Sequence, residues 1–310
     1  MSYKHVTVLL AEALRYLEPR PEGSYVDCTA GGGGHAEAIA RVLGPAGRLV
    51  ALDRDPLAVQ ATRERLQPFG ERIAVLHRSF GELEEVLREA GIAGVDGVLF
   101  DLGVSSPQLD EPERGFSYRQ DGPLDMRMDS RREGSAADLV NCLPEKSLAG
   151  IIRRYGEDPF AGRIAWAIAR EREKEPFQNT LRLDEVVREA VPHYARREGG
   201  HPARRTFQAL RIAVNDELGE LKAGLDAALR VVLAGGRVVV ISFHSLEDRI
   251  VKETFRREAH PCHCPPRMPC VCGLQPKVKL LTPKLVRPDE AEVEANLRAR
   301  GAKLRAALII

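Results

Sequence analysis

The first hundred residues alternate short apolar runs with segments of helical pattern, and this alternation constrains the fold more than any other feature of the sequence. The apolar runs have the length of strands and lie at residues 24–29, 47–53, 72–77 and 95–102. Helical patterns follow them, and at residues 56–66 Pro56 suits the first turn of a helix. The fourth run, VDGVLFDL, is almost wholly apolar, as expected of a strand covered on both faces. The pattern predicts βαβ units and an α/β fold with a Rossmann-like, doubly wound sheet.

The alternation stops near residue 111, and residues 111–211 contain no convincing strand. Helical patterns occur in that segment at residues 136–155, 161–173 and 184–194. After a long amphipathic helix over residues 206–233, strand-like runs return at residues 236–243 and 303–310. We therefore expect one discontinuous α/β domain, residues 1–110 and 212–310, interrupted by a helical insertion domain over residues 111–211.

Composition bounds the class of protein and its partners. No run of about 18 apolar residues exists, so no transmembrane helix is expected. The N-terminus lacks the basic region, apolar run and cleavage site of a signal peptide, which favours a cytoplasmic protein. The net charge is +1, but residues 242–310 carry 13 Lys or Arg against 8 Asp or Glu. That excess is a weak indication of a polyanionic partner, and an ordinary solvated face explains it equally well.

A glycine-rich segment, AGGGGH at residues 30–35, follows the first predicted strand and opens a helical pattern. Glycines let the backbone come close to a ligand, and a helix N-terminus favours negative charge. Asp53 ends the second predicted strand, where it can accept hydrogen bonds from ribose hydroxyls. The segment is neither GxGxxG nor a Walker A loop. A nucleotide-type ligand, either a dinucleotide or S-adenosylmethionine, is the favoured interpretation, and a purely structural turn is the alternative.

A long segment, FDLGVSSPQLDEPERGFSYRQDGPLDMRM, begins in the fourth predicted strand and spans residues 100–128. It closely resembles the signature of the bacterial MraW/RsmH family of 16S rRNA (cytosine amino) methyltransferases. Further blocks that resemble the family lie at residues 3–14, 27–39, 201–218 and 240–252. The resemblance runs from about residue 3 to residue 305, and its motifs are long and specific.

The resemblance implies a class I S-adenosylmethionine-dependent methyltransferase fold interrupted by a helical insertion. It implies S-adenosylmethionine as the cofactor, with contacts that carry over to Gly33, Gly34, His35, Asp53, Phe80, Asp101 and Gln108. The implied substrate is the exocyclic amino group of one cytidine in the decoding region of 16S rRNA, within the small ribosomal subunit. The chain departs from the family at Cys28, where members often have Gly, and in NLRARGAKLR at residues 296–305, which lacks a proline and a serine.

Methyl transfer to an amino nitrogen needs in-line positioning and acceptors for the amino protons, and it needs no covalent intermediate on the enzyme. Amino methyltransferases of DNA carry an (Asp/Asn/Ser)-Pro-Pro-aromatic loop after the fourth strand, whereas this chain has Asp101-Leu102-Gly103-Val104. Asp101 is the first candidate for orienting the cofactor or the base. The alternative is a carboxylate that caps a nearby loop.

Two further catalytic candidates each have a structural alternative. Asp125 could accept a hydrogen bond from the target amino group or simply pair with Arg127. His244 follows the fifth strand, at the rim where a parallel sheet opens its binding crevice. It could contact the base or a phosphate, or be structural. For Asn215, polar packing within a helix is slightly the better interpretation.

The insertion domain is expected to recognise the substrate. Its candidate phosphate contacts are arginines near its two ends: Arg114, Arg119, Arg127, Arg204 and Arg205. Phe116 and Tyr118 are candidates for stacking on a flipped base. Taken one at a time, each of these residues fits ordinary surface or core better.

Four cysteines gather in HPCHCPPRMPCVCG at residues 260–273, namely Cys262, Cys264, Cys270 and Cys272. Zinc takes four such ligands, but its usual sites space them as C-x2–4-C, and a C-x-C pair is tight for one metal. Zinc, a disulfide and reduced thiols all stay open, and no residue is assigned as a metal ligand. Cys28 and Cys142 stand alone and resemble small core residues.

Two other classes of function fit less well. A nicotinamide-dependent oxidoreductase is disfavoured by the glycine spacing and by the lack of a second nucleotide-binding half. A non-catalytic RNA-binding factor is disfavoured by the complete set of cofactor positions. The sequence leaves the oligomeric state open, a homodimer included.

Overall fold

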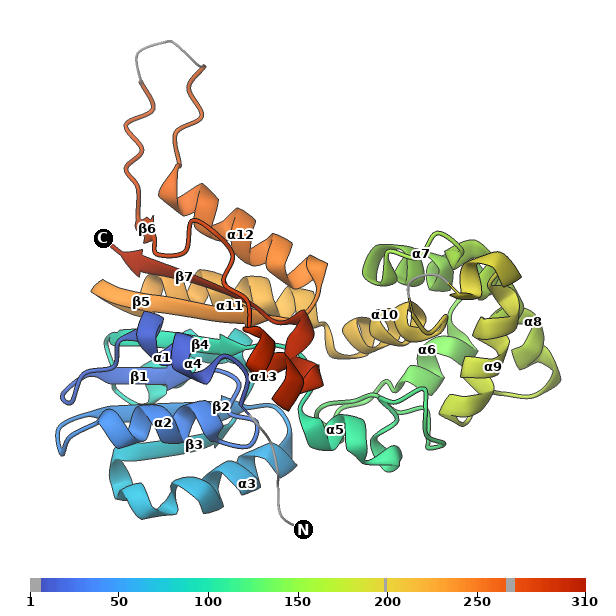
Figure 1. The fold of residues 1–310 in the computed structure, drawn as a ribbon, viewed down its shortest axis with the longest axis horizontal. Coiled ribbons are helices and arrows are strands. Elements are labelled where there is room, and N and C mark those ends of the chain that lie inside the picture. Colours follow the sequence, from blue (N-terminus) through green and yellow to red (C-terminus); the bar gives the residue numbers. More distant parts are fainter. Residues whose placement is uncertain (1–6, 198–199, 266–270) are drawn as a thin grey trace. The chain divides into compact units, whose positions relative to one another are not determined.

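The structure is a computed structural model that describes residues 7–197, 200–265 and 271–310. The chain divides into two compact units, one formed by Met1–Gly103 with Leu218–Ile310 and the other by Val104–Glu217. The first unit is α/β and the second is built from helices (Figure 1). The sequence predicted the interruption of the α/β part over residues 111–211.

The first unit contains a seven-stranded sheet of order β3-β2-β1-β4-β5-β7-β6. Its strands are β1 (Ser24–Asp27), β2 (Arg48–Asp53), β3 (Ile73–His77), β4 (Val95–Asp101), β5 (Val232–Ser242), β6 (Val278–Leu280) and β7 (Lys303–Ile309). β1 to β5 run parallel, and β7 lies antiparallel between β5 and β6. From β1 the chain winds outward to β3 and then crosses to β4 on the other side of β1. The predicted Rossmann-like, doubly wound fold is confirmed.

Successive side chains of each strand pack into two different cores, one on each face of the sheet. Val98 and Phe100 of β4 belong to the core covered by α4 (Leu83–Glu89), α11 (Glu217–Val231) and α12 (Ser245–Ala259). Leu99 belongs to the opposite core, covered by α1 (Leu10–Leu17), α2 (Gly34–Val42) and α3 (Pro56–Leu66) (Figure 1). Because both faces are covered, β4 is apolar almost throughout.

The carboxyl ends of the central parallel strands meet at one edge of the sheet. Asp27, Asp53 and Asp101 are the last residues of β1, β2 and β4, and Ser242 is the last residue of β5. β1 pairs with both β2 and β4, and Asp101 lies opposite Ile241 in β5. The strand order reverses between β1 and β4, and ligands bind outside the carboxyl ends of parallel strands at such a point.

The second unit has a hydrophobic core of its own. Its helices are α5 (Ser106–Asp110), α6 (Ala136–Cys142), α7 (Glu145–Gly156), α8 (Ala161–Lys174), α9 (Thr180–Ala190) and α10 (Arg204–Asn215). Leu148, Ile152, Ile164, Ile168 and Phe207 are buried together in this core. The residues described in this unit form no strand, only an isolated bridge between Pro123 and Asn179.

Two helices predicted as continuous are each divided, and the strand β6 and the short helices α1, α5 and α13 (Glu290–Ala295) were not predicted. The helix predicted over residues 136–155 breaks before Pro144, because proline disfavours helical backbone in the residue before it. The helix predicted over residues 206–233 breaks at Asp216, whose φ of 45° is left-handed. The three-residue β6 and the six-residue α13 are too short to show a period.

None of the described helices is both long and apolar enough to cross a membrane.

Candidate active site

The glycine-rich segment forms the turn between β1 and α2. Gly33, the residue before α2, has a φ of 77°, a conformation that residues with a side chain rarely adopt. A Cβ atom on Gly34, the first residue of α2, would overlap the hydroxyl group of Thr7. Gly33, the residue before α2, has no side chain that could cap the helix, and a helix N-terminus favours a negatively charged ligand group. The structure thus brings the predicted Gly33 and Gly34 to a turn where only bare backbone fits.

Asp53 is held by backbone amides on both of its carboxylate oxygens. The N–H of Gly31 in the glycine turn donates to Oδ2 at 2.7 Å, and the N–H of Asp55 donates to Oδ1 at 2.8 Å. Burial raises the pKa of Asp53 to about 6, although these two hydrogen bonds act in the opposite direction. Each oxygen keeps a lone pair, so the fixed carboxylate can accept hydrogen bonds from vicinal hydroxyls.

Asp27 and Asp101 each have one buried carboxylate oxygen, Oδ2 of Asp27 and Oδ1 of Asp101, that lacks a hydrogen-bond partner among the described residues. Burial raises the pKa of Asp27 to about 7. Burial, together with the charges of Asp27 and Glu247, raises the pKa of Asp101 well above its usual value. Buried polar atoms are rarely left unpaired, so these two oxygens are fitted to a polar ligand.

Thr29 and His35 fix Asp101 relative to the glycine turn. The backbone N–H of Asp101 donates to the Thr29 hydroxyl at 2.5 Å, and the Thr29 N–H donates to Asp27 at 3.1 Å. Nδ1 of His35, a residue only 4% exposed, lies 3.6 Å from Oδ2 of Asp101. The predicted His35 therefore lies against the predicted Asp101. Sequence reasoning did not single out Asp27 or Thr29 for a role, although Asp27 ends an apolar strand as Asp53 and Asp101 do.

Phe80 follows β3 as the first residue of the 3₁₀ turn η2 (Phe80–Glu82). Its ring packs edge-on against Phe100 with centroids 5.6 Å apart, and the guanidinium carbon of Arg54 lies 5.6 Å from its centroid. The side chain is buried in the core beneath α11. Little of the ring is left for a ligand.

His244 caps α12. Its Nδ1 accepts the N–H of Glu247 at 3.4 Å, while the Glu247 carboxylate accepts the N–H groups of Phe243 and His244. Nε2 of His244 lies 3.1 Å from the same carboxylate. This reciprocal capping box anchors the start of α12 at the end of β5. The structure shows the structural alternative for His244, and a catalytic role stays a prediction.

Gln108 and Asp125 belong to the second unit. Gln108 is buried in α5, where its Oε1 accepts the N–H of Ser105 at 3.0 Å. Both carboxylate oxygens of Asp125 accept from the Arg127 guanidinium, at 2.8 and 2.7 Å. Partial burial would raise the pKa of Asp125, but the hydrogen bonds and charge of Arg127 hold it below its usual value. The pairing with Arg127 is the alternative that the structure shows, and a catalytic role for Asp125 stays a prediction.

Asn215 is the last residue of α10 and fixes a strained turn. Its amide group donates to the carbonyl oxygen of Met126 at 2.7 Å, and its Oδ1 accepts the N–H of Met128 at 2.8 Å. Met126 between these bonds is buried and has a φ of 61°, which is rare for a residue with a long side chain. The interpretation of Asn215 as polar packing is confirmed, at a helix end rather than within a helix.

Several candidate RNA contacts have partners inside the second unit. The Tyr118 ring stacks on His201 with centroids 4.5 Å apart, and Phe116 is buried. Arg114 donates to the carbonyl oxygens of Arg127 and Met128, and Arg205 donates to that of Glu157. Their roles toward RNA stay predictions. For the two single cysteines, Cys28 is buried as predicted, whereas Cys142 is exposed at the end of α6, so its prediction as a core residue was wrong.

In the first unit, one edge of the sheet thus holds a bare glycine turn, a carboxylate poised for hydroxyl groups and two buried carboxyl groups with free acceptors. This combination fits S-adenosylmethionine, which carries a ribose, a charged amino acid moiety and a cationic sulfur. The segment that forms this turn, AGGGGH at residues 30–35, does not have the GxGxxG spacing typical of dinucleotide-binding proteins.

Comparison with known proteins gives the same answer over the whole chain. The model of the MraW methylase family matches residues 2–310. Ribosomal RNA small subunit methyltransferase H of Symbiobacterium thermophilum is 55% identical over 99% of this chain and 96% of its own length. Proteins of that name from Heliobacterium modesticaldum and Geobacter sulfurreducens are 52% and 54% identical, each over 99% of both chains. The fold is that of class I S-adenosylmethionine-dependent methyltransferases. The chain therefore belongs to the MraW methylase family, and S-adenosylmethionine is its cofactor.

Proposed function

We propose that the protein transfers a methyl group from S-adenosylmethionine to the exocyclic amino group of one cytidine in 16S rRNA of the small ribosomal subunit. The observation that carries the proposal is Asp101, a buried carboxyl group with a free acceptor oxygen at the switch point of the sheet. The full-length similarity to proteins named ribosomal RNA small subunit methyltransferase H supports the choice of substrate. A protein that acts on ribosomal subunits is expected in the cytoplasm.

The cofactor is assigned to the edge residues of the first unit. Backbone groups at Gly33, Gly34 and His35 approach it, and Asp53 accepts from its ribose hydroxyls. Phe80 and Asp101 complete the set in this unit. A cofactor contact by Gln108, in α5, is carried over from the family resemblance alone and stays a prediction. When bound, S-adenosylmethionine supplies an electrophilic methyl group on its sulfonium sulfur.

Asp101 is assigned to the substrate amino group. The lone pair of that nitrogen is delocalised into the cytosine ring, so a carboxylate that accepts an amino hydrogen makes the nitrogen a better nucleophile. The new carbon–nitrogen bond would form as the methyl carbon–sulfur bond breaks, with its electron pair left on the sulfur of the neutral thioether. The nitrogen then becomes acidic, and its proton would pass to Asp101. Burial raises the pKa of Asp101, and a carboxylate of raised pKa is a stronger proton acceptor. Nδ1 of His35 lies 3.6 Å from the other oxygen of Asp101.

No covalent enzyme intermediate is required. The only cysteine described next to the glycine turn is Cys28, and burial raises the pKa of its thiol well above the usual value. A thiol that stays protonated is a poor nucleophile. Direct in-line transfer is therefore the proposed route. Asp125 and His244 are kept as secondary catalytic candidates. Asp125 is paired with Arg127, and His244 caps α12.

The test uses the full chain, purified small subunits and S-adenosylmethionine with a labelled methyl group. Nuclease digestion and mass spectrometry of the nucleosides should give N4-methylcytidine at one position of 16S rRNA. Asp101→Asn should lower the rate at least about 100-fold, the range for loss of an acid–base group. Glu64→Gln, on the exposed face of α3, is the control and should leave the rate unchanged. Methylation at a ring carbon, or on a different nucleoside, would contradict the proposal.

A further inference from the structure

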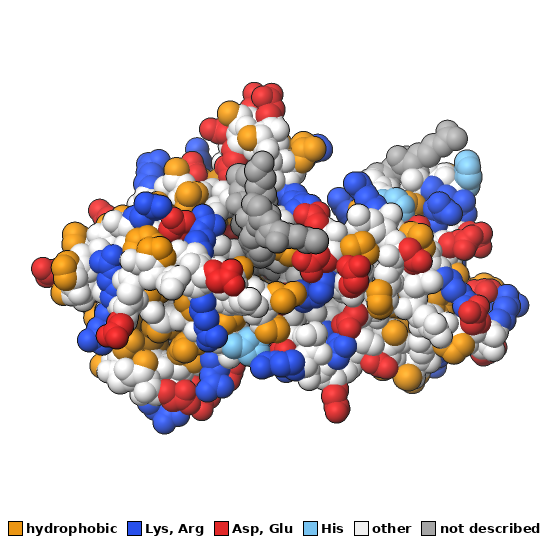
Figure 2. Space-filling view, turned by 90° about the horizontal axis from the view of Figure 1, so that it is seen from below, with side chains coloured by type: hydrophobic (Ala, Val, Ile, Leu, Met, Phe, Trp, Pro, Cys, Tyr) orange, Lys and Arg blue, Asp and Glu red, His pale blue; other side chains and the backbone are white. Residues whose placement is uncertain are grey.

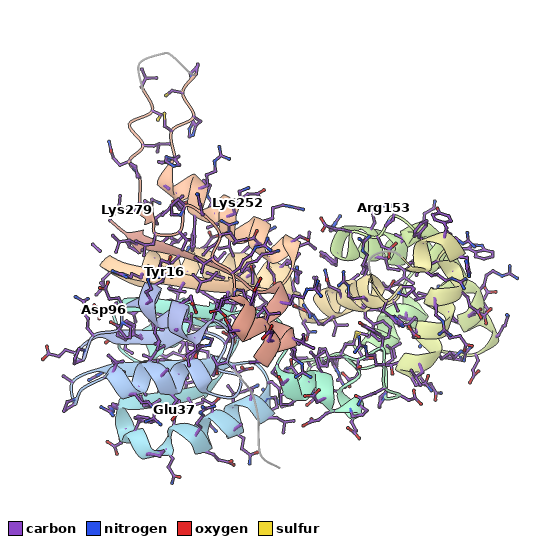
Figure 3. The ribbon with its side chains drawn as sticks, in the orientation of Figure 1. Tyr16, Glu37, Asp96, Arg153, Lys252 and Lys279 are labelled. Carbon is purple, nitrogen blue, oxygen red and sulfur yellow. The ribbon has the colours of Figure 1, made fainter. Side chains whose placement is uncertain are left out.

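The segment between α12 and β6 is long, and its described residues form no apolar core. Lys252 on α12 and Lys279 on β6 mark the elements from which its two legs extend (Figure 3). The N–H of Lys277 donates to the carbonyl oxygen of Glu258 at 2.9 Å and joins the legs at their base. The buried apolar clusters include Ala259 and Val278 but no described residue between them. Since loops of this length are uncommon in compact domains, its described legs need another source of order.

Three cysteine side chains converge in this loop. The Sγ atoms of Cys262, Cys264 and Cys272 all lie within 4.8 Å of one another. Cys262 and Cys264 belong to the leg that leaves α12, and Cys272 belongs to the leg that returns to β6. No disulfide joins two of the described cysteines, and Cys270 lies outside the described residues. The convergence therefore brings together residues from both legs of the loop.

We propose that Cys262, Cys264 and Cys272 bind a zinc ion that cross-links the two legs. Zinc–sulfur bonds of about 2.3 Å in a tetrahedron place the sulfur atoms about 3.8 Å apart, so only small shifts separate the observed spacing from a metal site. The N–H of Val271 donates to Sγ of Cys264 at 3.4 Å, and such a donor stabilises a thiolate and orients it. Each thiol releases its proton as its zinc–sulfur bond forms, and no electron is transferred.

The site is structural and separate from the methyl-transfer edge. Three protein ligands leave one tetrahedral position for a further ligand, but these side chains belong to a loop beyond α12 and not to the carboxyl edge of β1, β2 and β4. An ion that joins the legs stabilises their folded conformation, as the apolar core does elsewhere in the first unit. Loss of zinc should therefore loosen this loop and leave S-adenosylmethionine binding intact.

The test begins with the full chain, free of affinity tags and purified without chelators from medium that contains zinc. Elemental mass spectrometry should find about one zinc ion per chain. The double variant Cys262→Ser with Cys272→Ser should retain less than a tenth of that amount. Cys142→Ser, an exposed cysteine on α6, is the matched control and should retain all of it. Replacement of the ion by Co²⁺ should give intense sulfur-to-metal absorption in the parent and in the control, but not in the double variant.

Folding of the variants is checked separately by circular dichroism and by S-adenosylmethionine binding, both of which should match the parent. Limited proteolysis should cut the loop of the double variant at least about tenfold faster. The proposal is overturned if the parent holds no zinc after reconstitution, or if the double variant holds as much as the parent. Mass mapping under non-reducing conditions that finds any of the three cysteines in a disulfide overturns it equally.

Discussion

Three aspartates end three neighbouring strands, and their surroundings give them different chemistry. Both oxygens of Asp53 accept from the backbone, which fixes the carboxylate for hydrogen bonds from hydroxyl groups. Asp27 and Asp101 each keep a buried oxygen that finds no partner in the described part of the chain, and burial raises the pKa of both. Residue type alone therefore does not separate a ribose ligand from a proton acceptor. What separates them is whether one carboxylate oxygen is left without a partner in the described part of the chain, as it is in Asp27 and Asp101 but not in Asp53.

Asp53→Ala is expected to weaken S-adenosylmethionine binding by about 1.5–3 kcal/mol, or roughly 10- to 150-fold, because it removes charge-assisted hydrogen bonds to the ribose. Calorimetry on the full chain measures the change, with Glu64→Ala on the exposed face of α3 as the control. An unchanged affinity would move the ribose contact to another residue, and Asp55 would be the next candidate.

Asp27 makes stability depend on pH in a direction that can be derived. Its folded pKa of about 7 lies above the usual value of 3.8, so between these values the folded chain holds a proton that the unfolded chain has lost. The free energy of unfolding contributed by this group is therefore fully present below about pH 4 and falls as the pH rises through 7.

In the variant Asp27→Asn the side chain cannot ionise, so the variant's free energy of unfolding does not fall with pH at this position. Without cofactor, its stability relative to the parent should be greater at pH 8 than at pH 5 by roughly 2–3 kcal/mol, since each pKa unit corresponds to about 1.4 kcal/mol. Urea unfolding followed by circular dichroism at the two pH values measures the difference. A pH-independent difference would show that Asp27 titrates near its usual value in the folded chain.

At the scale of helices and strands, the sequence predicted the elements that have a long apolar pattern. It did not predict helix ends that depend on a single residue. The apolar runs at residues 95–102 and 236–243 lie in β4 and β5, because a strand covered on both faces needs apolar side chains throughout. The break at Asp216 was missed, because apolar periodicity continues on both sides of one left-handed residue. The pairing of β6 with β7 also leaves no pattern in the local sequence, so β6 was not predicted.

The candidate site follows the same rule. Asp53 and Asp101 could be predicted because they end apolar strands, and in a parallel sheet such ends meet at one edge. The partners of Asp125 and His244 could not be decided, since Arg127 and Glu247 lie only two and three residues away and either role fits that spacing. Contacts such as those of Asn215 with Met126 and Met128 join residues more than eighty positions apart and leave no local pattern.

Asn215 holds the strained turn of the second unit, so its loss should destabilise that unit. Asn215→Ala leaves the buried N–H of Met128 without an acceptor and the left-handed Met126 without support, which should cost about 2–3 kcal/mol. Trp166 is the one tryptophan of the chain and lies on α8, so its fluorescence during urea unfolding reports on this unit.

The neighbouring Asp216→Gly is the matched control for Asn215→Ala. Glycine accepts the left-handed φ of 45°, so this change should alter the free energy of unfolding by less than about 1 kcal/mol. Equal destabilisation by both variants would mean that the helix end, and not the bonds to Met126 and Met128, is what Asn215 stabilises.

For the whole molecule, charge limits how RNA can be held. The net charge is +1, and on the face seen in Figure 2 basic and acidic side chains are mixed over both units. Several of the arginines that were candidates for phosphate contact are also engaged within the protein, as Arg127 is with Asp125. Counterion release needs many phosphate contacts, so it supplies little affinity for naked RNA here. Recognition must depend on shape and on phosphates that are already fixed in space.

The enzyme should therefore methylate an assembled small subunit faster than protein-free 16S rRNA. The target base must leave any stack to reach the sheet edge, and a rigid flanking strand lowers the entropic cost of that step. The helical second unit offers a further surface that can contact a small subunit, whereas naked RNA has no single fixed geometry for it to contact.

We expect a rate at least about tenfold higher on subunits at one salt concentration, a free-energy difference of about 1.4 kcal/mol. Labelled methyl transfer to the two substrates measures it, with rRNA extracted from the same subunits as the matched substrate. Equal rates, or faster transfer to the extracted rRNA, would show that the enzyme reads local RNA sequence and that the second unit serves another purpose.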